Sequence, residues 1–135
     1  MTFKDVRFVH ISIAAPPAGV AALLRDARRL PEWAPNFGDE IKPDGDRWIM
    51  RTKAGPCIVR MVDKNDLGVA DHWVTPPGAS EEMHNAIRVT ENGGGSLVVF
   101  HLYRQDGFDD ARFNEDEALV SADLRRLKAL VEGEA

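Results

Sequence analysis

The sequence predicts an α+β protein in which a meander of antiparallel strands precedes one long C-terminal helix. Between Trp48 and Tyr103, short runs of β-forming residues alternate with turns rich in Gly, Pro and Asn. After Gly107 the apolar residues follow a helical period, which continues to about Glu132. A strand-like run over residues 6–13 stands before the meander, so we expect one sheet and one helix that covers it.

The N-terminal region predicts a strand followed by a short helix. Within residues 6–13, Val9, Ile11 and Ile13 share one face of the strand. Pro16-Pro17 ends this strand, and proline is well tolerated in the first turn of a helix. A helix is therefore predicted over residues 17–26, and Pro31 limits its continuation.

The meander divides into strands at four turns, each of which contains Gly, Pro or Asn. Side-chain parity then assigns the faces, because neighbouring residues of a strand point to opposite sides of the sheet. The predicted strands are residues 48–53, 57–63, 69–75, 83–90 and 97–104, with a short earlier strand near 39–42. The residues expected to point inward are Trp48, Met50, Thr52, Cys57, Val59, Met61, Ile87, Val89, Val98, Phe100 and Leu102, and those expected on the outer face are His84, Ala86, Arg88, His101 and Tyr103.

The C-terminal helix has one apolar face, with steps of three and four residues. Asn114 and Glu117 have the spacing of a capping box, which predicts Asn114 as the N-cap. The face comprises Phe113, Glu117, Val120, Leu124, Leu127 and Val131, and we expect it to cover the sheet.

Composition excludes several classes of protein. The 135 residues are 44% hydrophobic and carry a formal charge of −5, which suits one folded domain over residues 1–135 and argues against a nucleic-acid partner. The single cysteine, Cys57, excludes an internal disulfide and a Cys-based zinc site. No apolar stretch approaches the roughly 20 residues of a membrane-spanning helix. Because the N-terminus also lacks the apolar region of a signal peptide, we expect a cytoplasmic location.

Four segments and the order of elements resemble the START-like superfamily, also called SRPBCC, which includes polyketide cyclase/dehydrases and lipid-transfer domains. The segments are Ala14-Ala15-Pro16-Pro17, Leu30-Pro31-Glu32-Trp33, Gly68-Val69-Ala70-Asp71-His72-Trp73 and Asp123-Leu124-Arg125-Arg126-Leu127-Lys128. The resemblance implies a helix-grip fold, with a curved antiparallel sheet wrapped around the long C-terminal helix and two short helices after the first strand. It also implies a cavity between sheet and helix that binds a hydrophobic or aromatic small molecule, such as a lipid or a polyketide-like metabolite.

The predicted inner face is mostly apolar and aromatic, as expected for a ligand pocket. The same pattern also fits side chains that simply pack together as a core. The residues predicted to line a pocket are Ile11, Trp33, Phe37, Trp48, Met50, Met61, Ile87, Phe100, Leu102, Val120 and Leu124.

An alternative function is a cyclase/dehydratase-type enzyme in which His72 and an acidic helix residue, Asp123 or Glu117, transfer protons. Only one of Asp71 and His72 can face the cavity, and their apolar neighbours leave the choice open, with His72 preferred. Glu117 also fits a purely capping role, and Asp123 a salt bridge. No metal site or cofactor is predicted.

A third possibility is a protein-interaction or co-chaperone-like module. The outer face places His10, His84 and His101 beside Val99 and Tyr103, and mixed patches of this kind often mark contacts. This pattern predicts a homodimer that weakens when the histidines become protonated.

Overall fold

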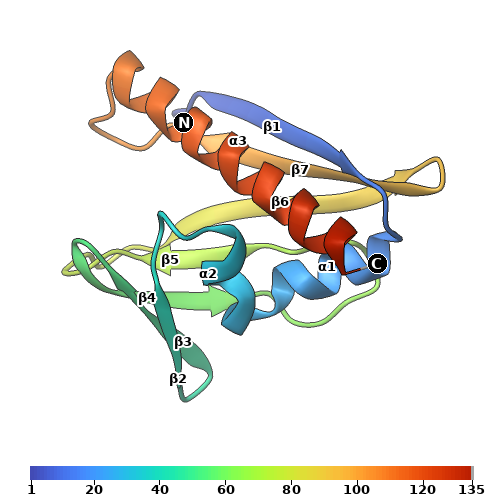
Figure 1. Cartoon of the computed structure of the whole chain (residues 1–135). Helices are drawn as coiled ribbons and strands as arrows, with labels where there is room; N and C mark the ends of the chain where they lie inside the picture. The colour runs from blue at the N-terminus through green and yellow to red at the C-terminus, as the bar shows by residue number, and fades with distance from the viewer. Residues whose placement is uncertain (135) are drawn as a thin grey trace.

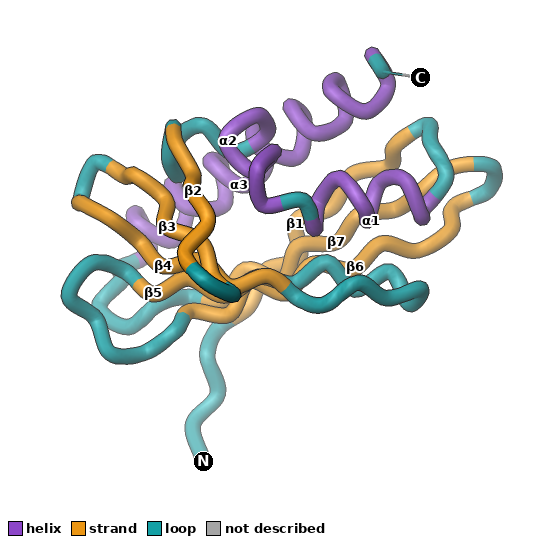
Figure 2. The backbone as a smooth tube through the Cα atoms, turned by 90° about the horizontal axis from the view of Figure 1, so that it is seen from below, coloured by secondary structure: helices purple, strands orange, loops and turns teal. Residues whose placement is uncertain are grey.

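The computed structural model describes residues 1–134 and consists of a seven-stranded antiparallel sheet with helices on one side. The strand order is β1-β7-β6-β5-β4-β3-β2, and the sheet bends toward the helices, as Figures 1 and 2 show. In chain order the elements are β1 (Val6–Ile13), α1 (Pro17–Arg25), the 3-10 turn η1 (Ala27–Arg29), α2 (Leu30–Trp33), β2 (Glu40–Asp44), β3 (Arg47–Thr52), β4 (Gly55–Met61), β5 (His72–Thr75), β6 (Met83–Asn92), β7 (Gly95–Tyr103) and α3 (Asp110–Gly133). The α+β class and the helix-grip arrangement are confirmed.

The register of the hairpins confirms the predicted faces. Ile87 pairs with Phe100 and Val89 with Val98, and all four side chains are buried. In the other hairpin, Met50 pairs with Cys57 on the same inner face. A slip of one residue would have exchanged the two faces, so the alternating pattern and the turns were sufficient to fix the register.

Strand β5 is shorter than predicted. It begins at His72, while Val69 makes only an isolated bridge to Arg88. Gly68 adopts a positive φ of 75°, and its carbonyl accepts a hydrogen bond from the Val89 amide at 2.8 Å. A side chain at residue 68 would collide with the Val89 carbonyl, so the chain needs glycine at this approach.

The start of α3 differs from the prediction. The N-cap is Asp109, whose carboxylate accepts a hydrogen bond from the Arg112 amide at 2.8 Å. Asn114 instead lies in the second turn, where its side-chain oxygen accepts a hydrogen bond from Arg7 at 2.7 Å. The prediction of an Asn114 cap was wrong because two segments offered cap spacing and the upstream aspartate starts the helix one turn earlier.

Helix α3 is attached to the rest of the fold at both ends. At its start, the Arg7 guanidinium lies 4.1 Å from the centre of the Phe113 ring. At its end, Lys128 donates to the Ser12 carbonyl at 2.7 Å and Glu132 accepts from the Ala14 amide at 2.9 Å. Arg29 also forms an ion pair with Glu134. These contacts fix the distance of the helix from the sheet.

Candidate functional site

A cavity of about 410 Å³ lies between the inner face of the sheet, α2 and the first half of α3. Its floor comes from β5, β6 and β7, and its sides come from α2, the loop that follows it and the β3–β4 turn. Trp33, Phe37, Phe100, Leu102 and Val120 are predicted lining residues that form part of this wall. The wall is therefore largely apolar and aromatic.

The other six predicted lining residues lie outside this wall. Helix α1 packs against β6 and β7 and fills the adjoining part of the inner face with Val20, Leu23 and Leu24. The inner face is therefore divided into a packed half and an open half, a division that strand parity cannot reveal. Met50, Ile87 and Leu124 are buried in the core, and Ile11, Trp48 and Met61 are partly exposed and pack against it.

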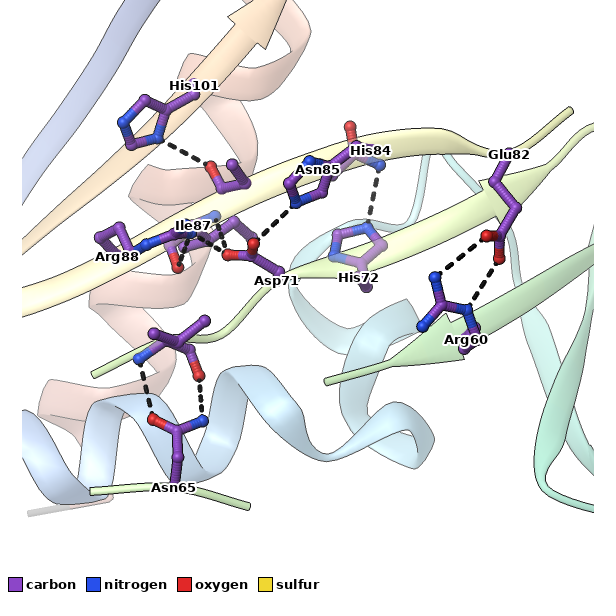
Figure 3. Close-up of polar contacts among 12 residues, drawn as sticks. Arg60, Asn65, Asp71, His72, Glu82, His84, Asn85, Ile87, Arg88 and His101 are labelled. Atoms are coloured by element: carbon purple, nitrogen blue, oxygen red, sulfur yellow. Dashed lines mark hydrogen bonds and ion pairs between the residues drawn. The ribbon is translucent and has the colours of Figure 1, made fainter. Parts of the chain in front are cut away.

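The imidazole ring of His72 borders the cavity and is uncharged. Its Nε2 lies 3.2 Å from the Asn85 side-chain amide nitrogen (Figure 3), so Nε2 accepts this bond and Nδ1 carries the proton. Burial lowers the pKa of His72 to about 4, because desolvation penalises the charged ring. At neutral pH the ring is therefore uncharged, and its one lone pair is already occupied.

Asp71 belongs to the opposite side of the sheet from His72, because its partner on β6 is His84 and that of His72 is the next residue, Asn85. Its carboxylate accepts hydrogen bonds from the Ile87 amide at 2.9 Å and from His84 at 2.7 Å, and it pairs with Arg88 (Figure 3). His84 in turn stacks on Trp73, with ring centres 4.8 Å apart. This cluster joins the segment before β5 to β6, so the adjacent residues Asp71 and His72 brace the sheet from opposite faces.

Two carboxylates of α3 line the cavity. Burial raises the pKa of Asp123 to about 6, although Arg126 donates to one of its oxygens at 2.6 Å and acts in the other direction. Burial also raises the pKa of Asp116, one of the wall residues that the sequence reasoning missed. The spacing could have revealed it, because Asp116, Val120 and Asp123 stand at i, i+4 and i+7 on one helix face.

Glu117 is not part of the cavity wall. Its carboxylate forms an ion pair with Arg7 at 3.3 Å at the edge of the sheet, and both groups are partly exposed. The predicted capping role of Glu117 was wrong for the same reason as the Asn114 cap, because the helix begins earlier. The structure thus brings His72 and Asp123 to one cavity and leaves Glu117 outside it.

The sequence matches the family model described as polyketide cyclase / dehydrase and lipid transport over residues 8–132. The chain belongs to this family. Among solved structures, the fold is similar to the protein XoxI from Bacillus cereus, at 19% identity and a TM-score of 0.71, covering 96% of this chain and 98% of that one. The Aha1 dimer from Colwellia psychrerythraea is also similar, at 14% identity and a TM-score of 0.71, covering 93% of this chain and 94% of that one.

A third similar structure is DynU16, a protein of the dynemicin biosynthetic locus, at 16% identity and a TM-score of 0.70. The match covers 96% of this chain and 48% of that one. A search of curated proteins gave no match. At these identities the structural likenesses concern the fold alone.

Family membership supports a ligand-binding fold, and the described residues add two further findings. No helix within residues 1–134 is long and apolar enough to cross a membrane. In the same part of the chain, no group of three His, Cys, Asp or Glu side chains is arranged to hold a metal ion.

Asn85 is a second cavity residue that was not predicted from the sequence, although it shares strand parity with Ile87 and Val89.

Proposed function

We propose that this protein binds an apolar or aromatic small molecule, lipid-like or polyketide-like, in the cavity between the sheet and α3. The observation that carries the proposal is a half-open cavity of about 410 Å³ that is lined largely by apolar and aromatic side chains. Small-molecule pockets span roughly 300–1,000 Å³, whereas close-packed cores leave few voids larger than a water molecule. The inner face therefore does more than pack as a core.

Burial of the ligand supplies the main driving force. If a ligand buries ~200 Å² of apolar surface, at about 25 cal/mol per Å², the gain is about 5 kcal/mol before association costs. The wall adds flat aromatic surfaces, including Trp33 and Phe100, against which a ring system can stack. These terms favour a ligand with rings over a small polar metabolite.

Native mass spectrometry of protein purified from its own host tests this function directly, because a retained molecule shows its mass. A fluorescence titration with N-phenyl-1-naphthylamine, an uncharged apolar probe, gives an affinity that can be compared among variants. Val120 and Val131 form a matched pair for this titration. Both are α3 valines with the same 9% exposure, and only Val120 lines the cavity.

Val120→Trp adds about seven non-hydrogen atoms to the cavity wall, so it should weaken probe binding at least tenfold while the protein stays folded. Val131→Trp adds the same atoms to a packed site. It should lower the free energy of unfolding by about 1–3 kcal/mol and leave the affinity of the folded protein unchanged. Equal probe binding by the wild type and Val120→Trp would refute binding in this cavity.

The raised pKa of Asp123 favours a second candidate, an enzyme of the cyclase/dehydratase kind. A carboxyl group with a pKa of about 6 in an apolar cavity can donate or accept a proton near neutral pH. His72 is poorly suited to act as the base, because its lone pair already accepts the bond from Asn85. In this second function Asp123 is the proton-transfer group.

Incubation of the protein with its retained molecule, followed by mass spectrometry, tests this second function. Loss of one water molecule, or a change of retention time at constant mass, would indicate dehydration or cyclisation. Asp123→Asn should slow such a reaction about a hundredfold while probe binding is retained. A reaction of undiminished rate in this variant would exclude Asp123 as the proton-transfer group.

A further inference from the structure

Two carboxylates on the cavity wall keep oxygen atoms that are open to solvent. Arg126 donates to one oxygen of Asp123 at 2.6 Å, and the second oxygen, Oδ2, has no hydrogen-bond partner among residues 1–134. Within the same residues, the Asp116 carboxylate forms neither a hydrogen bond nor an ion pair. The sealed side-chain atoms that lack a partner all belong to other residues, so solvent in the cavity reaches and hydrates these oxygens.

The position of both groups already disfavours negative charge. The Asp123 side chain is only 15% exposed, and burial raises its pKa to about 6, with the charge of Asp116 acting in the same direction. Burial also raises the pKa of Asp116, although Arg112 acts against this. The two aspartates lie two helical turns apart on one face of α3, so they share the same cavity. Hydration of their open oxygens is what keeps them ionised at neutral pH.

An apolar ligand removes this hydration. It displaces water from the carboxylate oxygens and offers no hydrogen bond in return, and a charged group in that situation takes up a proton instead. The bond from Arg126 reaches only one oxygen of Asp123 and leaves the other unpaired. Lys53 and Arg112, the two cationic residues that border the cavity, are exposed and so belong to its rim.

We propose that the cavity binds an uncharged apolar ligand together with one proton, which Asp123 holds, so that the affinity falls as the pH rises. This inference rests on the proposed function and adds a regulation of the same site. The complex holds the proton more tightly than the free protein does, so the gain in affinity is complete below the pKa of the free protein and is lost at higher pH. A ligand with an ammonium group takes the place of the proton, so its affinity should change in the opposite direction.

Other titratable or charged groups also face the cavity, and the test must separate them from Asp123. Burial lowers the pKa of His72 to about 4, which is below the range of the test. All of these groups remain in an Asp123→Asn variant, so a comparison with this variant isolates the contribution of Asp123. On the wall they are Lys53 and Cys57 of the β3–β4 hairpin, His72 of β5, Tyr103 of β7, and Arg112 and Asp116 of α3, with Arg126 bound to Asp123 itself.

Pyrene tests this inference, because it is a hydrocarbon with no titratable or hydrogen-bonding group. Its counterpart is 1-pyrenemethylamine, a cation of nearly the same shape. The protein is titrated into each probe between pH 5 and pH 8, and the emission of the ring reports binding. The wild type should bind pyrene about tenfold more tightly at pH 5 than at pH 8, because uptake of one proton over about one pH unit changes an affinity tenfold. It should bind the amine about threefold or more weakly at pH 5 than at pH 8, because Asp123 then lacks its charge.

Asp123→Asn cannot titrate and resembles the protonated state. It should therefore bind pyrene at pH 8 about as tightly as the wild type does at pH 5, and its own change over this range should be less than about threefold. Glu117→Gln is the matched control, because Glu117 is a carboxylate of the same helix outside the cavity wall, and this variant should keep the wild-type change. In the wild type, the slope of log affinity against pH gives the number of protons taken up, so the test does not depend on the folding of a variant.

The outcomes separate this inference from the proposed function. A pyrene affinity of the wild type that does not depend on pH, or a full pH dependence that persists in Asp123→Asn, would overturn the inference and leave apolar binding intact. The same pH dependence for pyrene and for the amine would also overturn it, because the proton would then act on the fold and not on the charge of the cavity. If pyrene binds at no pH, the inference fails, and if N-phenyl-1-naphthylamine does not bind either, the proposed function fails as well.

Discussion

Replacement of Asp123 by Asn should stabilise the protein at neutral pH. Asp123 has a side chain that is only 15% exposed, and burial raises its pKa from 3.8 to about 6. The folded protein therefore holds this proton more tightly than the unfolded chain does. As the pH rises from about 4 to about 6, the wild type must ionise a buried carboxyl, and it loses stability over this window. Asn has nearly the same shape, and its side-chain oxygen can still accept the bond from Arg126.

The magnitude follows from the two pKa values. Each pH unit between them corresponds to about 1.4 kcal/mol, so a difference of about two units gives at most ~3 kcal/mol. Water that enters the cavity screens part of this penalty, and the Asn side chain interacts more weakly with Arg126 than a carboxylate does. We therefore expect Asp123→Asn to raise the free energy of unfolding by about 1–2 kcal/mol above pH 7 and by nearly zero below pH 4.

Urea unfolding of the two proteins at several pH values, followed by circular dichroism, measures this difference. The difference should grow through the window between pH 4 and pH 6 and then remain constant. A variant that is less stable than the wild type at pH 7.5, or a difference independent of pH, would refute the reasoning. The first result would mean that the Arg126 ion pair outweighs desolvation, and the second that the carboxyl titrates normally.

Three further predictions concern other parts of the fold. Asp71→Ala should lower the free energy of unfolding by about 2–4 kcal/mol, because it leaves the Ile87 amide and the side chains of His84 and Arg88 without their acceptor. Near-native stability of this variant in urea would contradict the prediction. Asp109→Ala should cost about 1 kcal/mol, and Asn114→Ala clearly less, because Asp109 caps α3; the reverse order in thermal unfolding would restore Asn114 as the cap. Self-association through the outer face stays a prediction. Sedimentation at micromolar concentration should show a dimer at pH 7.5 that weakens at pH 5.5. A monomer at pH 7.5, or a dimer that responds neither to pH nor to His101→Ala, would exclude this interface.

The fold was predictable because each local signal agreed with its neighbours. In the β6–β7 hairpin, alternating apolar residues and the Asn-Gly-Gly-Gly turn specify the same register, and the structure confirms it with the pair Ile87 and Phe100. The start of α3 was less predictable, because Asp109 and Asn114 both precede a plausible first helical turn. Only the contact of Asn114 with Arg7, 107 residues away in the chain, shows that its side chain is used elsewhere.

The site was less predictable than the fold, because strand parity identifies a face but not the part of it that stays open. Ile87 and Phe100 pair directly on the inner face, yet only Phe100 borders the cavity. The position of α1 decides this difference, and it depends on tertiary packing. Likewise, Asp71 and His72 have apolar neighbours on both sides, and their partners across the sheet, His84 and Asn85, distinguish the two faces.

The attachment of α3 at both of its ends has a mechanical consequence for the cavity. Because α3 is attached near Phe113 and again near Glu132, the part of the helix between these contacts resists displacement. This part carries the cavity residues Asp116 and Asp123. The opposite side of the cavity is softer, because α2 is a helix of four residues followed by the irregular segment that contains Phe37. We therefore expect a bulky ligand to enter the cavity by displacing the α2 segment outward, while α3 stays in place.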